Sequence, residues 1–217
     1  MAKLKSTFRN MFLSLLSISL VVALLLAQVH KLTEEPIAEA KAKKLENAIM
    51  EVVPEFDNNP IDEAYMMPVG EGDSLLVYPA LNGGEIVGFA INSYSNNGFS
   101  GNIEIMVGLD TSNKVINYAV LSHAETPGLG SKMGEWFKDK SKPNQSVLGR
   151  DLSKGLLKVA NDGGDIDAIT ASTITSRAFL EAVNKAYAAY KESDADTSAT
   201  HKDLHDNKEE KGDNGDE

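Results

Sequence analysis

The sequence predicts an α+β protein in which one N-terminal transmembrane helix precedes a single domain, built on a twisted antiparallel sheet flanked by helices. Three observations support this prediction. An apolar run without charge occupies residues 11–29. Four segments with strand-like composition follow one another through short turns in the middle of the chain. An amphipathic helical stripe then closes the domain before residue 191. With 217 residues, the chain is long enough for one such domain and its appendages.

The composition excludes several classes of function. The chain has 32 acidic and 21 basic residues and a formal net charge of −11, so it repels a phosphate backbone, and we expect no nucleic-acid partner. It has no cysteine, which excludes disulfides, thiolate metal sites and Cys-ligated iron–sulfur clusters. Any redox role must therefore use a cofactor that is held in another way.

The apolar run at residues 11–29 is predicted to span a membrane, because its length is close to the roughly 20 residues that cross a hydrocarbon core. Charges on its two sides differ: Lys3, Lys5 and Arg9 precede it, whereas Glu34 and Glu35 follow. This asymmetry places residues 1–10 in the cytoplasm and the remainder outside. A cleaved signal peptide is the alternative, but it has a shorter apolar region and a small-x-small site, which "LLAQVHK" lacks. The sequence favours an uncleaved anchor.

Residues 30–72 are predicted to form a stalk helix and a connecting loop. Pro36 stands near the expected start of the helix and Pro54 at its end, with apolar residues between them at mostly helical spacing. The segment from Pro54 to Gly72 is rich in Asn, Asp and Pro, which is typical of a loop.

Residues 73–191 are predicted to form the folded domain. Its expected strands are 74–80, 86–94, 103–110 and 114–123, followed by a turn leading to a helix around Trp136, a short strand at 155–160 and a last helix from Ser176 to Tyr190. From residue 192 to 217 the chain is acidic and has one Leu and no aromatic residue, which predicts a disordered tail.

The segment "DAITASTITS" concentrates five hydroxyl side chains, at Thr170, Ser172, Thr173, Thr175 and Ser176. One interpretation is that they cap the last helix, with Thr175 and Ser176 as the expected cap. A cap accounts for only one or two of them. The amides and positive dipole of a helix N-terminus also favour a phosphate, to which Arg177 could add a contact. The segment therefore suits a phosphorylated group, either bound or attached through a hydroxyl oxygen.

Three other patterns have competing interpretations. "GFSGN" at 98–102, together with Gly108, would suit a phosphate cradle, but a turn between strands is favoured because the P-loop and dinucleotide spacings are absent. His123 and Glu125 are either an acid–base pair or part of a turn, and no nucleophile is evident beside them. His201 and His205 have the spacing of a metal pair, but a solvated tail is favoured.

The stretch "DAITAST" resembles the flavinylation motif of FMN-binding domains, in which an Asp is followed three residues later by Ser or Thr, two small residues and an acceptor Thr. The acceptor would be Thr173, with Thr175 and then Ser172 as the next candidates. Together with "HAETPGLGSKM", "GNIEIMVGLD" and the single anchor, this motif makes the chain similar to the G subunit of the Rnf electron transport complex. The C subunit of the sodium-translocating NADH:quinone reductase represents a related family.

This resemblance implies an FMN joined to Thr173 by a phosphoester and installed by a flavin transferase of the ApbE type. Asp167 and Thr170 would belong to the recognition sequence, with Ser172 beside the acceptor. The turn "ETPGLG" would lie near the flavin, and four of its residues would shape the pocket: Glu125, Thr126, Gly128 and Leu129. No catalytic or metal-binding residue is implied.

The resemblance further implies an electron carrier rather than a self-sufficient catalyst. It would serve a complex of the bacterial inner membrane that couples electron transfer involving ferredoxin or NAD to ion translocation. The anchor would dock on other Rnf subunits, and the FMN domain would face the periplasm. The alternative is a membrane-tethered extracytoplasmic ligand-binding or scaffolding module without covalent flavin, in which the hydroxyls only cap a helix.

Overall fold

The computed structural model describes residues 7–70 and 72–209, which divide into two compact units, the second beginning at Glu46. Helix α1 (Phe8–Val52) runs through the end of the first unit into the second without a break. The separate start predicted near Pro36 is wrong, because good helix formers on both sides of this proline continue the helix. Within the described residues, α1 alone is long and apolar enough to cross a membrane.

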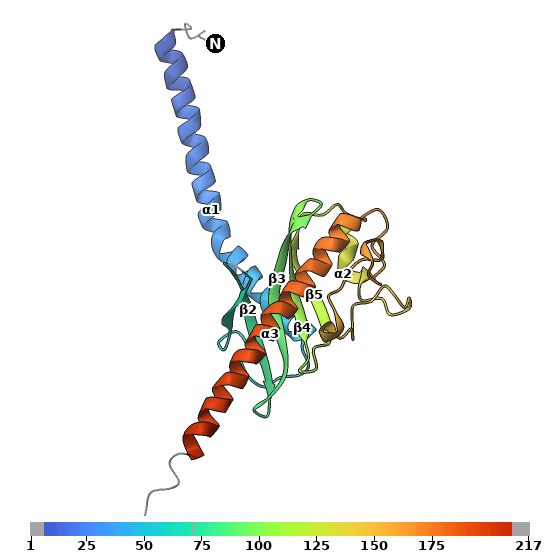
Figure 1. Cartoon of the computed structure of the whole chain (residues 1–217). Helices are drawn as coiled ribbons and strands as arrows, with labels where there is room; N and C mark the ends of the chain where they lie inside the picture. The colour runs from blue at the N-terminus through green and yellow to red at the C-terminus, as the bar shows by residue number, and fades with distance from the viewer. Residues whose placement is uncertain (1–6, 71, 210–217) are drawn as a thin grey trace, which may run out of the picture. The chain divides into compact units, whose positions relative to one another are not determined.

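The second unit contains a five-stranded antiparallel sheet in the order β1-β2-β3-β4-β5 (Figure 1). The strands are β1 (Tyr65–Val69), β2 (Asp73–Asn82), β3 (Glu85–Gly98), β4 (Gly101–Leu109) and β5 (Val115–His123). The predicted α+β class and the four predicted strands from 74 to 123 are confirmed. Strand β1 lies in the predicted loop, where Pro68 is tolerated because the strand is at the edge of the sheet.

The predicted strand at 155–160 is wrong. Val159 forms an isolated bridge with Ile166, and this segment joins no ladder. Leu157 and Val159 are nevertheless buried, so the apolar pattern marks core contacts of an irregular segment rather than a strand. The predicted helix around Trp136 is present as α2 (Met133–Trp136).

Helix α3 (Thr173–Glu209) lies across one face of the sheet. Alternate residues of a strand point to the same face of the sheet, and on the face covered by α3 such residues form the core. Examples are Ile105 and Val107 of β4, which lie in one core with Phe179 and Val183 of α3. The helix begins at Thr173 instead of Ser176. Its backbone continues past Tyr190 because no Pro or Gly interrupts it before Glu209.

The side chains of residues 192–209 and the whole of 210–217 lie outside the described residues. The helical backbone of 192–209 differs from the predicted disorder there, whereas the predicted disorder of 210–217 and the role of the two histidines stay predictions.

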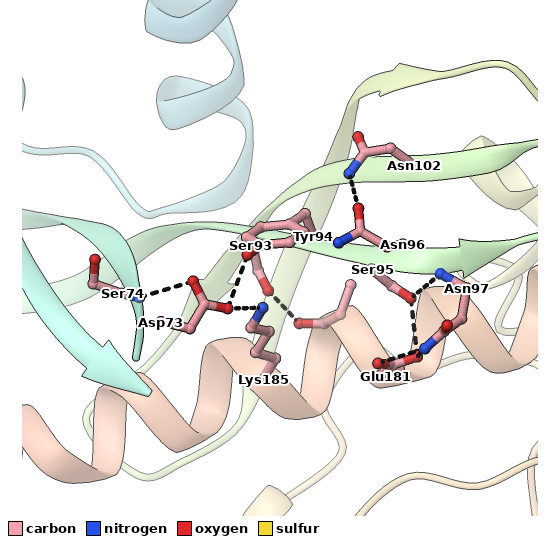
Figure 2. A network of polar contacts seen from close by, with 11 residues as sticks. Asp73, Ser74, Ser93, Tyr94, Ser95, Asn96, Asn97, Asn102, Glu181 and Lys185 are labelled. Carbon is pink, nitrogen blue, oxygen red and sulfur yellow. Dashed lines mark hydrogen bonds and ion pairs between the residues drawn. The ribbon is translucent and has the colours of Figure 1, made fainter. Parts of the chain in front are cut away.

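Polar contacts also attach α3 to the sheet, as Figure 2 shows. The Ser93 hydroxyl donates to the carbonyl oxygen of Ala182 at 2.7 Å. Lys185 pairs with Asp73 at the start of β2, and its Nζ lies 3.6 Å from the ring centroid of Tyr94. These contacts fix the rotation of α3 on the sheet, and so the position of its first turn.

The last turns of α1 belong to the second unit and pack on the opposite face of the sheet. Ile49 and Val52 are buried there. A Cβ at Gly108 of β4 would overlap the backbone carbonyl of Val52, so only glycine allows this close approach. Gly108 is therefore a packing residue, and the phosphate cradle considered for 98–102 with Gly108 is not formed.

Candidate functional site

A cavity of about 350 Å³ lies at the N-terminal end of α3. Three segments that are distant in the sequence form it: the β3–β4 turn at 98–101, the turn at 125–130 after β5, and residues 171–175. Each contributes one large apolar side chain, namely Phe99, Leu129 and Ile174. We call this the apolar cavity. Its volume lies in the range of about 300–1,000 Å³ that is typical of small-molecule sites.

The three apolar side chains of this cavity are unusually exposed. The exposed fraction is 68% for Phe99, 42% for Leu129 and 47% for Ile174. Adjacent apolar side chains that remain in water at a concave surface are typical of a ligand-binding or interaction site. The cavity is therefore suited to a ligand with an apolar surface.

A second hollow of about 420 Å³ lies beside the first and has a more polar lining. It is lined in part by Trp136, Lys142, Asp167 and Thr170. We call this the polar cavity. Thr173, the first residue of α3, lines both cavities and is half-buried. Within the described residues its hydroxyl makes no hydrogen bond, so the oxygen is not committed to the fold.

The segment leading to Thr173 is held by its backbone. The Asp167 amide donates to the carbonyl oxygen of Asn144 at 2.7 Å, and the Trp136 indole donates to the carbonyl oxygen of Asp167 at 3.0 Å. Ala171 has a φ of 60°, a left-handed conformation that is uncommon for a residue with a Cβ. This anchoring leaves the Asp167 and Thr170 side chains exposed, where another protein can reach them.

The five hydroxyls of the segment have different roles. Ser176 accepts from the Ile169 amide at 2.9 Å and donates to the Ser172 carbonyl at 3.0 Å, which closes the loop onto the helix. Thr175 donates to Glu125 at 2.6 Å. Both lie inside the first turn of α3, so the expectation that they form the N-cap is wrong. Ser172 precedes the helix, is buried, and lines the apolar cavity but not the polar cavity.

The turn after β5 and Thr173 line the same cavity. Glu125, Thr126 and Leu129 line the apolar cavity, whereas Gly128 supports the turn with a φ of 76° and does not line the cavity. His123 accepts a hydrogen bond from the Glu125 amide through Nδ1, at 3.1 Å. This contact favours the turn interpretation of the His–Glu pair.

Arg177, by contrast, is not directed toward the hydroxyls. It makes a bidentate ion pair with Asp162, with both distances 2.7 Å. The hydrogen bond from Arg177 lowers the pKa of Asp162 below its usual value. This ion pair argues against the suggested contact of Arg177 with a phosphate.

Phe99 and Ile174 are cavity residues that the sequence interpretation missed. Phe99 stands in a turn between Gly98 and Gly101, where an aromatic side chain cannot join the core. An aromatic residue in a glycine-rich turn could therefore have indicated a binding residue. Ile174 is an exposed Ile next to the acceptor motif. Within the described residues, no group of three or more His, Asp or Glu side chains is placed to bind a metal ion.

Comparison with known proteins gives the class of this chain. Residues 98–188 match the model of the FMN-binding domain family, and this range contains both turns and the first turns of α3. The chain thus contains a domain of the FMN-binding class and, within the described residues, one helix that is long and apolar enough to cross a membrane.

Relatives define the family more closely. The G subunit of an ion-translocating oxidoreductase complex from Shewanella amazonensis is 32% identical over 194 residues, which covers 83% of this chain and 86% of the relative. The G subunits from Vibrio vulnificus and Yersinia pestis are 34% and 35% identical over 171 residues, covering 73% and 75% of this chain and 78% and 80% of the relatives. The chain belongs to this family, the G subunits of ion-translocating oxidoreductase complexes.

Proposed function

We propose that this protein is the electron-transfer flavoprotein subunit of a membrane-bound complex that couples electron transfer involving ferredoxin or NAD to ion translocation, and that it carries FMN on Thr173 through a phosphoester. The observation that carries the proposal is the place of Thr173. Its uncommitted hydroxyl stands at the start of α3, where the apolar and polar cavities meet. The relatives are G subunits of ion-translocating oxidoreductase complexes, which supports the coupling.

The residues around Thr173 fit an FMN. The exposed Phe99, Leu129 and Ile174 would be covered by the flat isoalloxazine ring, which offsets the cost of leaving them in water. The first amides of α3 have no acceptor within the helix and favour a phosphate. Lys142, which lines the polar cavity, adds a positive charge on that side.

Attachment to Thr173 requires an activated donor. The hydroxyl oxygen forms a new bond to the phosphorus of a flavin nucleotide, the anhydride bond from that phosphorus to the leaving nucleotide breaks, and the hydroxyl proton is released. A flavin transferase of the ApbE type would perform this step and read the exposed Asp167 and Thr170. The hydroxyl of Thr175 is already bound to Glu125, which favours Thr173 as the acceptor.

When bound, FMN supplies the reversible uptake and release of electrons. The residues of this chain hold and orient it: Thr173 as the tether, Phe99, Leu129 and Ile174 as apolar walls. None of them needs to transfer a proton in a substrate reaction. A covalent tether also prevents loss of the cofactor outside the cytoplasm, where FMN is not replenished. The anchor in α1 would dock on the integral-membrane subunits, with the domain on the periplasmic face.

The tether is tested by co-expression with a flavin transferase, followed by a denaturing gel viewed under ultraviolet light. We expect a fluorescent band for the wild type and for Thr111→Ala, a control in an exposed turn, and a dark band for Thr173→Ala. Ser172→Ala should retain fluorescence, and Thr175→Ala should still become fluorescent at the end point, although more slowly because it loses the contact with Glu125. A dark wild-type band would favour the alternative, a ligand-binding or scaffolding module.

The orientation is tested separately. With residues 1–10 in the cytoplasm, a tag on the C-terminal tail should be removed by protease added to intact spheroplasts. A cytoplasmic protein that stays intact in the same sample controls for lysis. A tag that is cut only after the membrane is broken would reverse the proposed orientation.

A further inference from the structure

The side chain of Glu125, in the turn after β5, forms hydrogen bonds with both of the other segments that line the apolar cavity. This side chain is 5% exposed. Its Oε1 accepts from the Ser100 amide in the β3–β4 turn at 3.0 Å, and its Oε2 accepts from the Thr175 hydroxyl in the first turn of α3 at 2.6 Å. Each carboxylate oxygen therefore joins the turn after β5 to a different segment.

The packing around this carboxylate is tight on both sides. A Cβ at Gly98 would lie 2.8 Å from Oε1, and a Cβ at Gly130 would lie 2.5 Å from Oε2. Contacts this close are not found for real Cβ atoms, so both positions depend on glycine to let the carboxylate approach. The carboxylate is thus enclosed by the segments that it joins.

The segments that Glu125 joins also present the cavity walls. Phe99 precedes Ser100, Ile174 precedes Thr175, and Leu129 stands in the same turn as Glu125. Thr173 lies two residues before Thr175, within the same helical turn. Fixing the Thr175 hydroxyl therefore fixes the start of α3 and the place of the Thr173 oxygen. Hydrogen bonds to a charged acceptor are stronger than neutral ones, which suits this role.

We propose that Glu125 is a positioning residue that assembles the apolar cavity and orients Thr173 for modification, and that its carboxylate is not a ligand of the flavin. The modification step rests on the proposed function. The assembly of the cavity does not, because its contacts join residues of this chain alone.

The first experiment needs no flavin. Amide hydrogen exchange is measured on the detergent-solubilised full chain for the wild type, Glu125→Ala, and the control Glu135→Gln, which changes an exposed carboxylate. In Glu125→Ala we expect exchange about tenfold faster or more in peptides covering 98–101 and 172–176, and unchanged exchange in β4. Unchanged exchange in both peptides, or equal acceleration in β4, would overturn the assembly role.

The second experiment measures the rate of flavin transfer to Thr173. Thr175→Val should slow this rate by about tenfold or more, because misplacing a reacting group by ~1 Å can cost on the order of 100-fold. Thr175→Ser keeps the donor to Glu125 and should restore it. A rate that is the same for Val and Ser would contradict the inference. Absence of any label on the wild type would instead contradict the proposed function and leave the exchange experiment valid.

Discussion

At the scale of single residues, the site depends on contacts between positions far apart in the sequence. Thr175 and Glu125 are separated by 50 positions and meet at 2.6 Å. The hydroxyl-rich segment was recognisable from composition, and its motif pointed to Thr173. Which hydroxyl forms which hydrogen bond was not predictable, because this depends on residues that the fold of the sheet places beside them, such as Glu125 beside Thr175.

Gly130→Ala tests the tight packing at the same scale. The added Cβ would lie 2.5 Å from Glu125 Oε2 and 2.8 Å from the Thr175 hydroxyl oxygen. We expect a loss of about 1–3 kcal/mol in the free energy of unfolding, the usual cost of overpacking. Gly134→Ala in α2 is the matched control, since its Cβ would meet nothing within 4 Å. It should be neutral or slightly stabilising, because Ala favours a helix. Denaturant unfolding measures both, and equal effects would disprove the packing argument.

At the scale of elements, strands with regular alternation were predictable and irregular ones were not. β3 and β4 show clear apolar periodicity and short turns. Strand β1 was not predicted, because it contains Pro68 and follows a segment rich in Asn and Asp, both of which are typical of loops. The strand forms through its pairing with β2. The segment containing Leu157 has apolar residues of a strand but meets the core without a ladder partner. The pattern of apolar residues in a segment predicts which side chains are buried. Whether the segment forms a strand depends also on a neighbouring strand with backbone groups free to form hydrogen bonds.

The contact between α3 and the start of β2 makes the stability depend on pH. Hydrogen bonds from Lys185 and from the Tyr94 hydroxyl hold the pKa of Asp73 below its usual value. Partial burial is the largest single influence on Lys185 and lowers its pKa, but the hydrogen bonds with Asp73 and Tyr94 and the nearby charge of Asp73 together raise this pKa above its usual value. Because the pKa of Asp73 is depressed by folding, its contribution is complete above the unfolded pKa of about 3.9. It is lost as pH falls toward the folded value.

Asp73→Asn should therefore lower the free energy of unfolding by about 0.5–1 kcal/mol at neutral pH, the range of a partly exposed ion pair. The difference from the wild type should disappear as pH falls below about 4. Urea unfolding at a series of pH values measures it. In a Lys185→Met background the same substitution should have a smaller effect, which a double-mutant cycle reports. An effect that is constant with pH, or unchanged in that background, would mean that the ion pair does not stabilise α3 on the sheet.

At the scale of the whole molecule, one continuous helix serves two purposes. The apolar part of α1 supplies the membrane segment, while its last turns, with Ala48, Ile49 and Val52, are buried in the second unit. The sequence indicated both an anchor and a stalk, but it placed a break between them at Pro36. The helix that carries the apolar segment thus also contributes its last turns to the core of the second unit.

This organisation predicts where the chain can be cut. A variant that starts at Glu46 keeps Ala48, Ile49 and Val52, and should be soluble, fold cooperatively and accept flavin on Thr173. A variant that starts at Pro54 lacks these side chains. Burial of each large aliphatic side chain contributes roughly 1.5–3 kcal/mol, so the loss of Ile49 and Val52 should lower the free energy of unfolding by about 4 kcal/mol. Without the backbone of Val52, the close approach at Gly108 would be left open to water.

Both variants are compared by denaturant unfolding and by in-gel flavin fluorescence after co-expression with the transferase. The longer variant should match the full-length chain in label, and the shorter one should unfold at lower denaturant with less label. Equal stability of the two would show that the end of α1 is an anchor only, and that the contacts of Ile49 and Val52 do not hold the domain together. Failure of the longer variant to fold would instead show that residues before Glu46 belong to the folded core.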